Sequence, residues 1–119
     1  MEFLLDTNII LLHVREGFFN IAPADTQFII SVISEAEVLR YSGLSENDLR
    51  ELEIVLATLR VINVDSTIAR RAATLGRIRT TKLPDLLIAA TALELNIPLI
   101  TKNLHDFKDI PGLEVRDTM

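Results

Sequence analysis

The chain opens with residues 1–10, MEFLLDTNII, in which an apolar run stops at Asp6 and two more polar residues follow before the apolar residues resume. The apolar run predicts a short buried strand over residues 2–6, and the spacing that follows predicts a helix over residues 7–16. Asp6 has two interpretations at this junction. It caps the helix, because a carboxylate at a helix N-terminus accepts hydrogen bonds from free backbone N–H groups, or it is part of a metal site.

Short apolar runs and helical periodicity continue to alternate along the chain. Residues 27–33, QFIISVI, are almost entirely apolar, as expected of a strand covered on both faces of a parallel sheet. The other elements predicted are helices over residues 34–41, 45–59, 65–79 and 83–95 and strands over residues 60–64, 97–101 and 113–117. Alternating strands and helices form right-handed βαβ units, so we expect an α/β fold, a three-layer α/β/α sandwich on a mainly parallel sheet.

Length and composition limit the class of protein. With 119 residues, 49% of them hydrophobic, the chain suits one domain over residues 1–119. It has no cysteine, which excludes disulfides, thiolate metal sites and a cysteine nucleophile. The longest uncharged apolar stretch, LLIAATAL, is too short to cross a bilayer, and no basic segment of a signal peptide opens the chain. We expect a soluble cytoplasmic protein with no membrane partner.

The charge pattern bears on nucleic-acid binding. A net charge of -5 disfavours bulk attraction to a phosphate backbone, so any such binding needs a local basic patch or a bound cation. Residues 66–84 carry five basic side chains and no acidic one. The three nearest the end of this run, Arg77, Arg79 and Lys82, are candidates for contacts to nucleic-acid phosphates. A solvated helix face, or a surface that docks an acidic partner, is the other interpretation.

Polar residues follow three of the predicted strands, and another opens a helix. The carboxyl ends of parallel strands meet at one edge of a sheet, where ligands of such folds collect. The helix over residues 83–95 must run back toward the start of the next strand, so its N-terminus lies at the same edge. Five side chains are therefore expected to lie together: Asp6, Glu37, Asp85, Asn103 and Asp106.

Each acid also has a local interpretation. Asp6 and Asp85 suit helix N-termini, and Glu37 follows Ser34 at the spacing of a capping box. Several carboxylates within ~4–6 Å of each other oppose folding unless a cation lies among them, and oxygen ligands favour Mg²⁺ or Mn²⁺. Glu35 competes with Glu37 for the site, because residues two apart on a helix point to nearly opposite sides. We prefer Glu37, since Glu35 is expected on the more exposed side.

Four segments in order along the chain resemble the PIN-domain ribonucleases, in particular the small VapC-type toxins of toxin–antitoxin pairs. These segments are LLDTNII, ISVISEAEVL, LPDLLIAATALELNIPLIT and TKNLHDF. The resemblance implies a Mg²⁺- or Mn²⁺-dependent endoribonuclease with an RNA substrate, an antitoxin partner and a homodimeric state. Some members of this family have an acid at the position of Asn103, and others have Asn there and Asp three residues later. The fourth ligand therefore stays open between Asn103 and Asp106.

The resemblance also implies roles for individual residues. The metal ligands expected are Asp6, Glu37, Asp85, Asn103 and Asp106, and the carboxylates among them are the catalytic residues. A bound Mg²⁺ lowers the pKa of a water molecule and offsets charge on the phosphate. Thr7, Asn8 and Thr101 are expected to support the ligands by hydrogen bonds, although Thr7 and Asn8 also suit an ordinary helix start.

Two rival functions fit parts of the pattern. A receiver-like Mg²⁺-binding signalling domain is also a small α/β sandwich with acids at strand ends, but it needs an acidic pair after the first strand and a phosphorylatable acid after the third. Here Asp6 stands alone, and Asp65 after the third strand is followed by residues typical of a helix start. A phosphatase of the haloacid-dehalogenase type needs an acid where Asn8 stands. A catalytically inactive PIN homologue that acts as a binding module is the remaining alternative.

Overall fold

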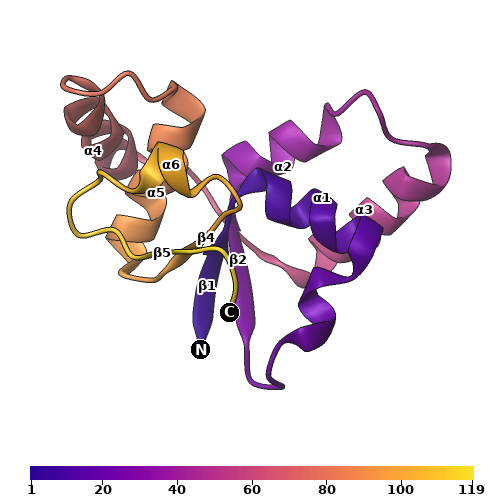
Figure 1. Ribbon diagram of the computed structural model, residues 1–119. Coiled ribbons are helices and arrows are strands. Elements are labelled where there is room, and N and C mark those ends of the chain that lie inside the picture. Colours follow the sequence, from indigo (N-terminus) through magenta and orange to yellow (C-terminus); the bar gives the residue numbers. More distant parts are fainter.

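A computed structural model describes all 119 residues (Figure 1). The strands are β1 (Glu2–Leu5), β2 (Gln27–Ser31), β3 (Arg60–Ile62), β4 (Leu99–Ile100) and β5 (Val115–Arg116). The helices are α1 (Thr7–Glu16), α2 (Val32–Leu39), α3 (Glu46–Thr58), α4 (Ser66–Gly76), α5 (Leu83–Leu95) and α6 (Leu104–Phe107), and a 3₁₀ helix, η1 (Phe18–Ile21), follows α1.

The five strands form one sheet in the order β3-β2-β1-β4-β5, and every neighbouring pair is parallel. In Figure 1, α1, α2 and α3 lie on one side of the sheet and α4, α5 and α6 on the other. The predicted three-layer α/β/α architecture is therefore confirmed. None of the helices combines the length and apolar character needed to span a membrane.

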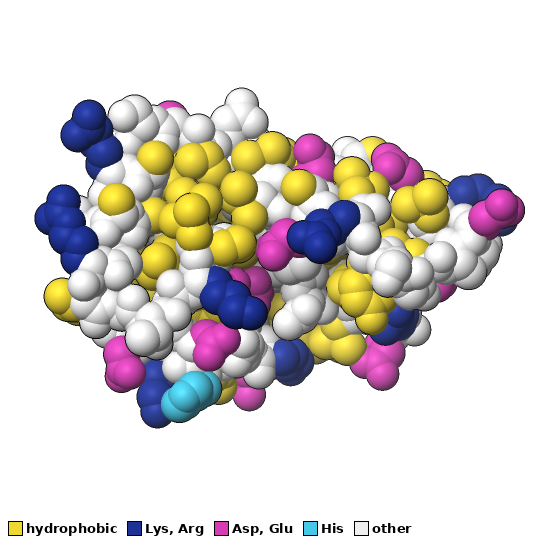
Figure 2. All heavy atoms as spheres, turned by 90° about the horizontal axis from the view of Figure 1, so that it is seen from above, with side chains coloured by type: hydrophobic (Ala, Val, Ile, Leu, Met, Phe, Trp, Pro, Cys, Tyr) yellow, Lys and Arg dark blue, Asp and Glu magenta, His cyan; other side chains and the backbone are white.

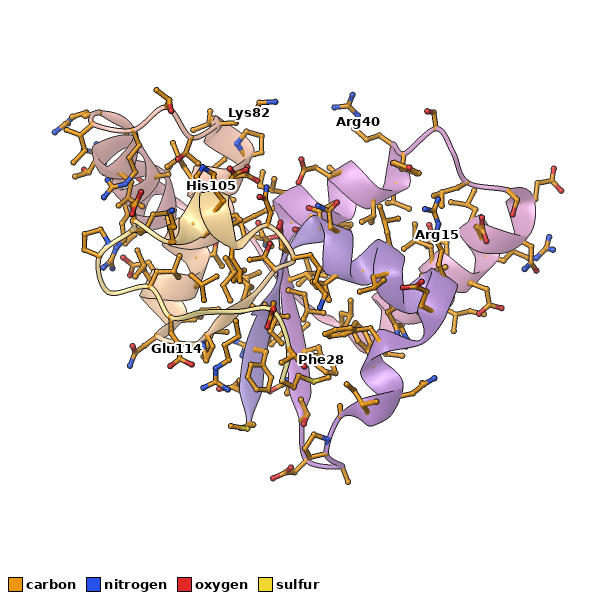
Figure 3. The ribbon with its side chains drawn as sticks, viewed as in Figure 1. Arg15, Phe28, Arg40, Lys82, His105 and Glu114 are labelled. Carbon is orange, nitrogen blue, oxygen red and sulfur yellow. The ribbon has the colours of Figure 1, made fainter.

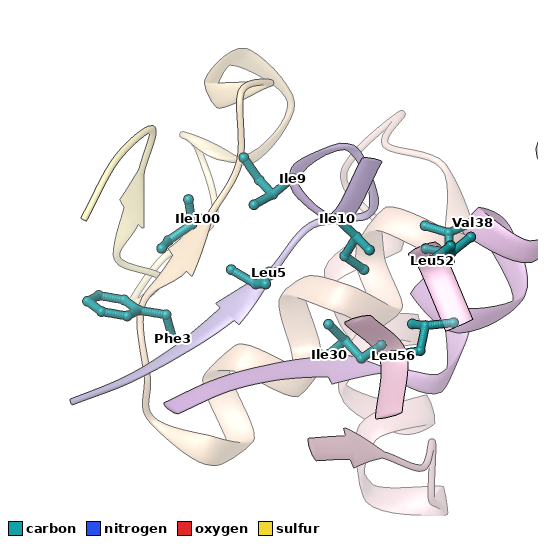
Figure 4. Close-up of a cluster of buried hydrophobic side chains, with 9 residues drawn as sticks. All are labelled: Phe3, Leu5, Ile9, Ile10, Ile30, Val38, Leu52, Leu56 and Ile100. Atoms are coloured by element: carbon teal, nitrogen blue, oxygen red, sulfur yellow. The ribbon is translucent and has the colours of Figure 1, made fainter. Parts of the chain in front are cut away.

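The sheet is covered on both faces because successive residues of its strands point to opposite sides. Phe3 and Leu5 of β1 pack with α1, α2 and α3 in a cluster of nine buried side chains (Figure 4). Leu4, between them, packs on the other face with Ile88 of α5 and Phe107 of α6. All three β1 side chains are at most 1% exposed. This two-sided burial explains why the strand sequences are uniformly apolar.

Several boundaries differ from the predicted ones. Strand β2 ends at Ser31, not at residue 33, because Ser31 caps α2 by accepting a hydrogen bond from the backbone N–H of Ile33 at 3.0 Å. The helix predicted to start at Ser34 therefore starts at Val32, and the capping-box interpretation of Ser34 and Glu37 is wrong. Ser45 does cap α3, in a capping box with Asp48. The short η1 and α6 were not predicted.

The strand order reverses direction between β1 and β4: β2 and β3 lie beyond β1, and β5 lies beyond β4. In open α/β sheets the crevice at such a reversal, outside the carboxyl ends of the strands, is the usual ligand site. At this edge, Asp6 is the first residue after β1 and Thr101 is the first residue after β4.

Candidate active site

Asp6 occupies the junction of β1 and α1 and caps the helix, as the first of its two interpretations predicts. Its Oδ1 caps α1 by accepting a hydrogen bond from the backbone N–H of Thr7 at 2.8 Å. Its Oδ2 accepts a hydrogen bond from the hydroxyl of Thr101 at 2.7 Å, and the residue is only 5% exposed. Burial raises the pKa of Asp6, although the hydrogen bonds from Thr101 and Thr7 oppose the rise. A carboxylate is thus held rigidly at the strand reversal.

Glu37 projects from α2 toward the N-terminus of α1. The Thr7 hydroxyl donates a hydrogen bond to Glu37 Oε1 at 2.6 Å, and the same hydroxyl lies 3.1 Å from Ser34 Oγ. Ser34 is fully buried inside α2, where it supports this contact instead of starting the helix. Glu35 makes no such contact. It is half-buried like Glu37, so the exposure difference expected between these two glutamates is absent.

Asp85 lies in the first turn of α5, whose N-terminus is at the same edge of the sheet. Burial first, and then the charges of three neighbouring carboxylates, raise its pKa to about 6. These neighbours are Asp6, Glu37 and Asp106, and Lys82 acts in the opposite direction. The charges of these four acids are therefore close enough to interact.

Asn103 and Asp106 lie in the segment that follows β4, at the same edge of the sheet. The backbone N–H of Asn103 donates to Thr101 Oγ1 at 2.9 Å, and its side-chain amide donates to Asp106 Oδ2 at 2.5 Å. Thr101 is fully buried. Because its hydroxyl bonds both to Asp6 and to the backbone of Asn103, it connects Asp6 to the start of α6. Thr7 and Thr101 therefore do contact the carboxylates or their neighbours, whereas Asn8 is exposed and makes no such contact.

As the side chains stand, no three acidic or histidine side chains converge closely enough to enclose one ion. The cluster is therefore looser than the sequence predicts. Glu37, Asp6 and Asp106 each accept a hydrogen bond from a different side chain: Thr7, Thr101 and Asn103, respectively. Glu37 and Asp85 are half-buried and Asp106 is exposed, so all three are accessible to a ligand from solvent.

A hollow of about 730 Å³ opens beside the cluster, between the α4–α5 connection and α6; we call it the α5–α6 hollow. Asp85, Asn103 and Asp106 line it together with basic side chains. Its remaining lining residues are Ile78, Arg79, Thr80, Thr81, Lys82, His105, Asp109 and Ile110.

The three basic residues predicted to contact RNA have different surroundings. Lys82 lines the hollow, is exposed, and makes no ion pair. Arg79 also lines the hollow, but its guanidinium donates to the backbone carbonyls of Leu75 at 3.0 Å and Asp109 at 3.1 Å. Arg77 is exposed and lies outside the lining. Lys82 is therefore the cation best placed for a ligand on this side.

A smaller hollow of about 320 Å³ lies on the other side of Glu37, between α1 and the end of α2; we call it the α1–α2 hollow. It is lined by Thr7, Asn8, Leu11, Glu37, Arg40, Tyr41 and Ser42. Figure 3 shows Lys82 and Arg40 at the same end of the molecule, one on each side of the edge where the strands end. In Figure 2, which looks onto this end, acidic and basic side chains stand close together near the middle of the face.

Sequence reasoning missed Ser34, Arg40 and Tyr41 as residues of this region, and it set aside His105, next to Asp106, as an incidental exposed residue. Ser34 was hidden because its position suits a helix cap. The Arg40–Tyr41 pair follows no spacing rule that would assign it to a site. It is found only when α1 and α2 are placed in space, whereas His105 lines the α5–α6 hollow.

The family model described as PIN domain matches residues 3–113. A "Ribonuclease VapC" of Rickettsia bellii (strain RML369-C) is 64% identical over 31 residues, which are 26% of this chain and 23% of that protein. The match to this curated relative thus spans about a quarter of its length.

Solved structures resemble the chain over nearly its whole length. VapBC2 from Rickettsia felis, solved bound to a DNA fragment from its promoter, contains a chain with a TM-score of 0.82 and 26% identity, covering 98% of both chains. A toxin–antitoxin complex from Klebsiella pneumoniae contains one with a TM-score of 0.74 and 34% identity, covering 92% of this chain and 93% of that one. VapBC-1 from nontypeable Haemophilus influenzae gives a TM-score of 0.79 at 25% identity, covering 98% and 97%.

Proposed function

The chain belongs to the PIN-domain family, and we propose that it is a Mg²⁺- or Mn²⁺-dependent endoribonuclease, the toxin of a toxin–antitoxin pair. The observation that carries this proposal is the placement of four acids, Asp6, Glu37, Asp85 and Asp106, at the carboxyl edge of the sheet, where burial and then the charges of the other three raise the pKa of Asp85. Such an arrangement disfavours folding on its own, so its presence in a family of this kind supports a catalytic use.

The donor set fits a hard divalent cation. All the candidate ligands are oxygens, from Asp6, Glu37, Asp85, Asp106 and the amide of Asn103, and no cysteine or histidine cluster offers a zinc site. Oxygen ligands favour Mg²⁺ or Mn²⁺. A cation among the four carboxylates would also relieve the repulsion that, after burial, raises the pKa of Asp85.

A bound Mg²⁺ would supply an acidified water molecule and charge compensation at the phosphate. The protein supplies the rest. Thr101 and the backbone of Thr7 fix both oxygens of Asp6, so this ligand does not reorganise. The Thr7 hydroxyl orients Glu37. Asp85, half-buried and facing the α5–α6 hollow, can accept a hydrogen bond from an attacking water, and Lys82 can hold a phosphate beside it.

The relatives support one of the proposed partners, the antitoxin. The complexes from Klebsiella pneumoniae and Rickettsia felis are described as toxin–antitoxin and VapBC assemblies. We propose that this chain likewise binds a cognate antitoxin, forms a homodimer, and cuts RNA as its substrate.

Incubation of the purified protein with mixed RNA tests the activity. We expect fragments in Mg²⁺, none in EDTA, and nearly none from Asp85→Asn, which removes one charge without changing the shape of the side chain. Asp65→Asn is the matched control, since Asp65 is also a helix N-terminal aspartate but caps α4 outside the cluster. Cleavage by Asp85→Asn at the wild-type rate would refute the assignment. Loss of cleavage in Asp65→Asn as well would show that the effect is structural.

The rival functions have less support. A receiver domain needs a free acid after the third strand, but Asp65 caps α4 by accepting a hydrogen bond from the backbone N–H of Ile68 at 2.9 Å. Incubation with acetyl phosphate distinguishes this function, because a receiver forms a stable acyl phosphate. An inactive PIN homologue would bind RNA or its antitoxin without producing fragments.

A further inference from the structure

We propose that the α1–α2 hollow binds the nucleotide that adjoins the cleavage site in a single-stranded RNA, with Arg40 on its phosphate and Tyr41 against its base. This inference rests on the proposed function, because it takes RNA as the substrate class. It adds a binding site on the side of the acid cluster opposite Lys82.

The position of the hollow is the first argument. Glu37 and Thr7 line it, and these two residues also belong to the acid cluster through their 2.6 Å hydrogen bond. An RNA strand bound at the acid cluster therefore extends directly into this hollow on the α2 side. The volume, about 320 Å³, is within the ~300–1,000 Å³ usual for ligand pockets.

Arg40 provides the charge. It is the only cationic residue that lines this hollow, and its guanidinium makes neither an ion pair nor a side-chain hydrogen bond. An arginine at the end of a helix also interacts favourably with the helix dipole, and that is the competing explanation of its position. The dipole does not explain why the side chain borders the acid cluster, where it faces Lys82 across the edge of the sheet (Figure 3).

Tyr41 provides an aromatic surface held in place by its neighbours. The guanidinium carbon of Arg15 lies 5.4 Å from the centre of its ring. Gly43 lies so close that an added Cβ would come within 2.9 Å of the ring. The residue is nevertheless 44% exposed, so part of the ring remains open to a ligand. Proteins that bind single strands combine such aromatic platforms with basic side chains along the backbone path.

The two hollows together give a path for one strand. Lys82 lines the hollow on the α5 side together with Asp85 and Asp106, and Arg40 lines the hollow on the α2 side together with Glu37. In a chain of net charge -5, these local cations are what offsets repulsion of the phosphates. The placement thus explains how an acidic protein holds RNA over an acidic centre.

The test measures binding of a short fluorescein-labelled single-stranded RNA of mixed sequence by anisotropy, in EDTA so that nothing is cut. We expect Arg40→Ala to weaken binding about tenfold and to reduce the slope of log K against log salt by ~0.7, the value for one phosphate contact. Tyr41→Ala should weaken binding by about fivefold or more with the slope unchanged. Tyr41→Phe should bind like the wild type, because it keeps the ring.

Arg50→Ala is the matched control. Arg50 is exposed on α3, makes no ion pair and lines neither hollow, so its loss should leave affinity and slope unchanged. If Arg40→Ala and Tyr41→Ala bind RNA like the wild type, the proposal is wrong. If these variants instead lose only the antitoxin in a pull-down, the hollow is a protein-docking surface and the proposal is likewise overturned.

The same variants separate this inference from the proposed activity. RNA cleavage in Mg²⁺ that is unaffected by Arg40→Ala at low RNA concentration would overturn the binding site while leaving the nuclease assignment intact. RNA binding that depends on Arg40 and Tyr41, in a protein that cuts no RNA, would support the binding site and refute the nuclease assignment.

Discussion

Thr101, which follows β4, donates its hydroxyl hydrogen to Oδ2 of Asp6, which follows β1, across 2.7 Å and 95 residues of sequence. Both residues are buried. The bond joins the two strands between which the sheet order reverses, and Thr101 Oγ1 also accepts from the backbone N–H of Asn103. One hydroxyl therefore fixes the central carboxylate and the entry to α6.

We predict that Thr101→Val lowers the free energy of unfolding by ~2–3 kcal/mol, because it leaves a buried carboxylate oxygen and a backbone N–H without partners at almost constant volume. Urea denaturation measures the change. Thr91→Val is the control: Thr91 is also fully buried, but its hydroxyl donates only to a carbonyl of its own helix, at Leu87. A smaller loss for Thr101→Val than for Thr91→Val would contradict the role given to Thr101.

The pKa of Asp85, raised to about 6, predicts a pH dependence of stability in EDTA. The folded state binds this proton more tightly than the unfolded state, whose pKa is near 3.8. Stability is therefore expected to fall as the pH rises from about 4 to about 6. Asp85→Asn should remove this part of the dependence and stabilise the protein at pH ~7 by ~1–2 kcal/mol, a value reduced for the partial exposure of the group.

Thermal unfolding at several pH values, with and without Mg²⁺, checks this prediction. Mg²⁺ should raise the midpoint of the wild type much more than that of Asp85→Asn, since a cation relieves the same repulsion. An equal rise in both proteins would mean that Asp85 does not share the cation's site.

The elements that sequence reasoning predicted well carry their own local signals. Helix α3 has a capping box and a leucine stripe, and Pro84 stands in the first turn of α5. The predicted end of β2 was wrong because Val32 and Ile33 suit a strand as well as a helix. Only the cap made by Ser31 ends the strand before them. Four-residue elements such as α6 are too short to show a period.

The candidate site was predictable for a different reason. Parallel strands deliver their carboxyl ends to one edge, so Asp6 and Asp106 follow from the strand order without any knowledge of packing. The choice of Glu37 over Glu35 depends on which side of α2 contacts Thr7 of α1. The structural role of Arg79 could not be predicted in this way, because the backbone carbonyl of Asp109 to which it donates lies 30 residues away in the chain. Which helix faces border a hollow is decided by such distant contacts.

Arg79 and Lys82 are expected to respond differently to the loss of their charge. Lys82→Gln should weaken RNA binding and lower its salt slope by ~0.7 while leaving stability unchanged, because Lys82 is exposed and unpaired. Arg79→Gln should lower the free energy of unfolding by ~1–2 kcal/mol, because two backbone carbonyls lose their donor. Arg77→Gln should change neither quantity. Anisotropy titrations and urea denaturation of the three variants provide the measurements, and a Lys82→Gln protein with wild-type affinity and slope would exclude a phosphate contact.

His13 gives the protein a second and opposite dependence on pH. Its Nδ1 accepts a hydrogen bond from the backbone N–H of Phe19 at 2.9 Å, and its ring stacks on that of Phe19 with centres 3.8 Å apart. A protonated ring cannot accept this bond, and burial lowers the pKa of His13 below 6.5. The unfolded state therefore binds the His13 proton more tightly than the folded state does. The stabilisation that neutral His13 provides is complete above pH ~6.5 and is lost as the pH falls below this value.

His13→Phe, which keeps the stacked ring, should abolish this contribution, whereas the wild type should lose up to ~1 kcal/mol at pH ~5, a figure limited by the partial exposure of His13. Because the Asp85 carboxyl titrates in the same range with the opposite sign, the comparison is made in the Asp85→Asn background. There the wild-type histidine should add a decline of the free energy of unfolding on acidification, and phenylalanine should lack this added decline. Identical pH profiles for the two proteins would mean that the Phe19 N–H bond does not depend on the charge of His13.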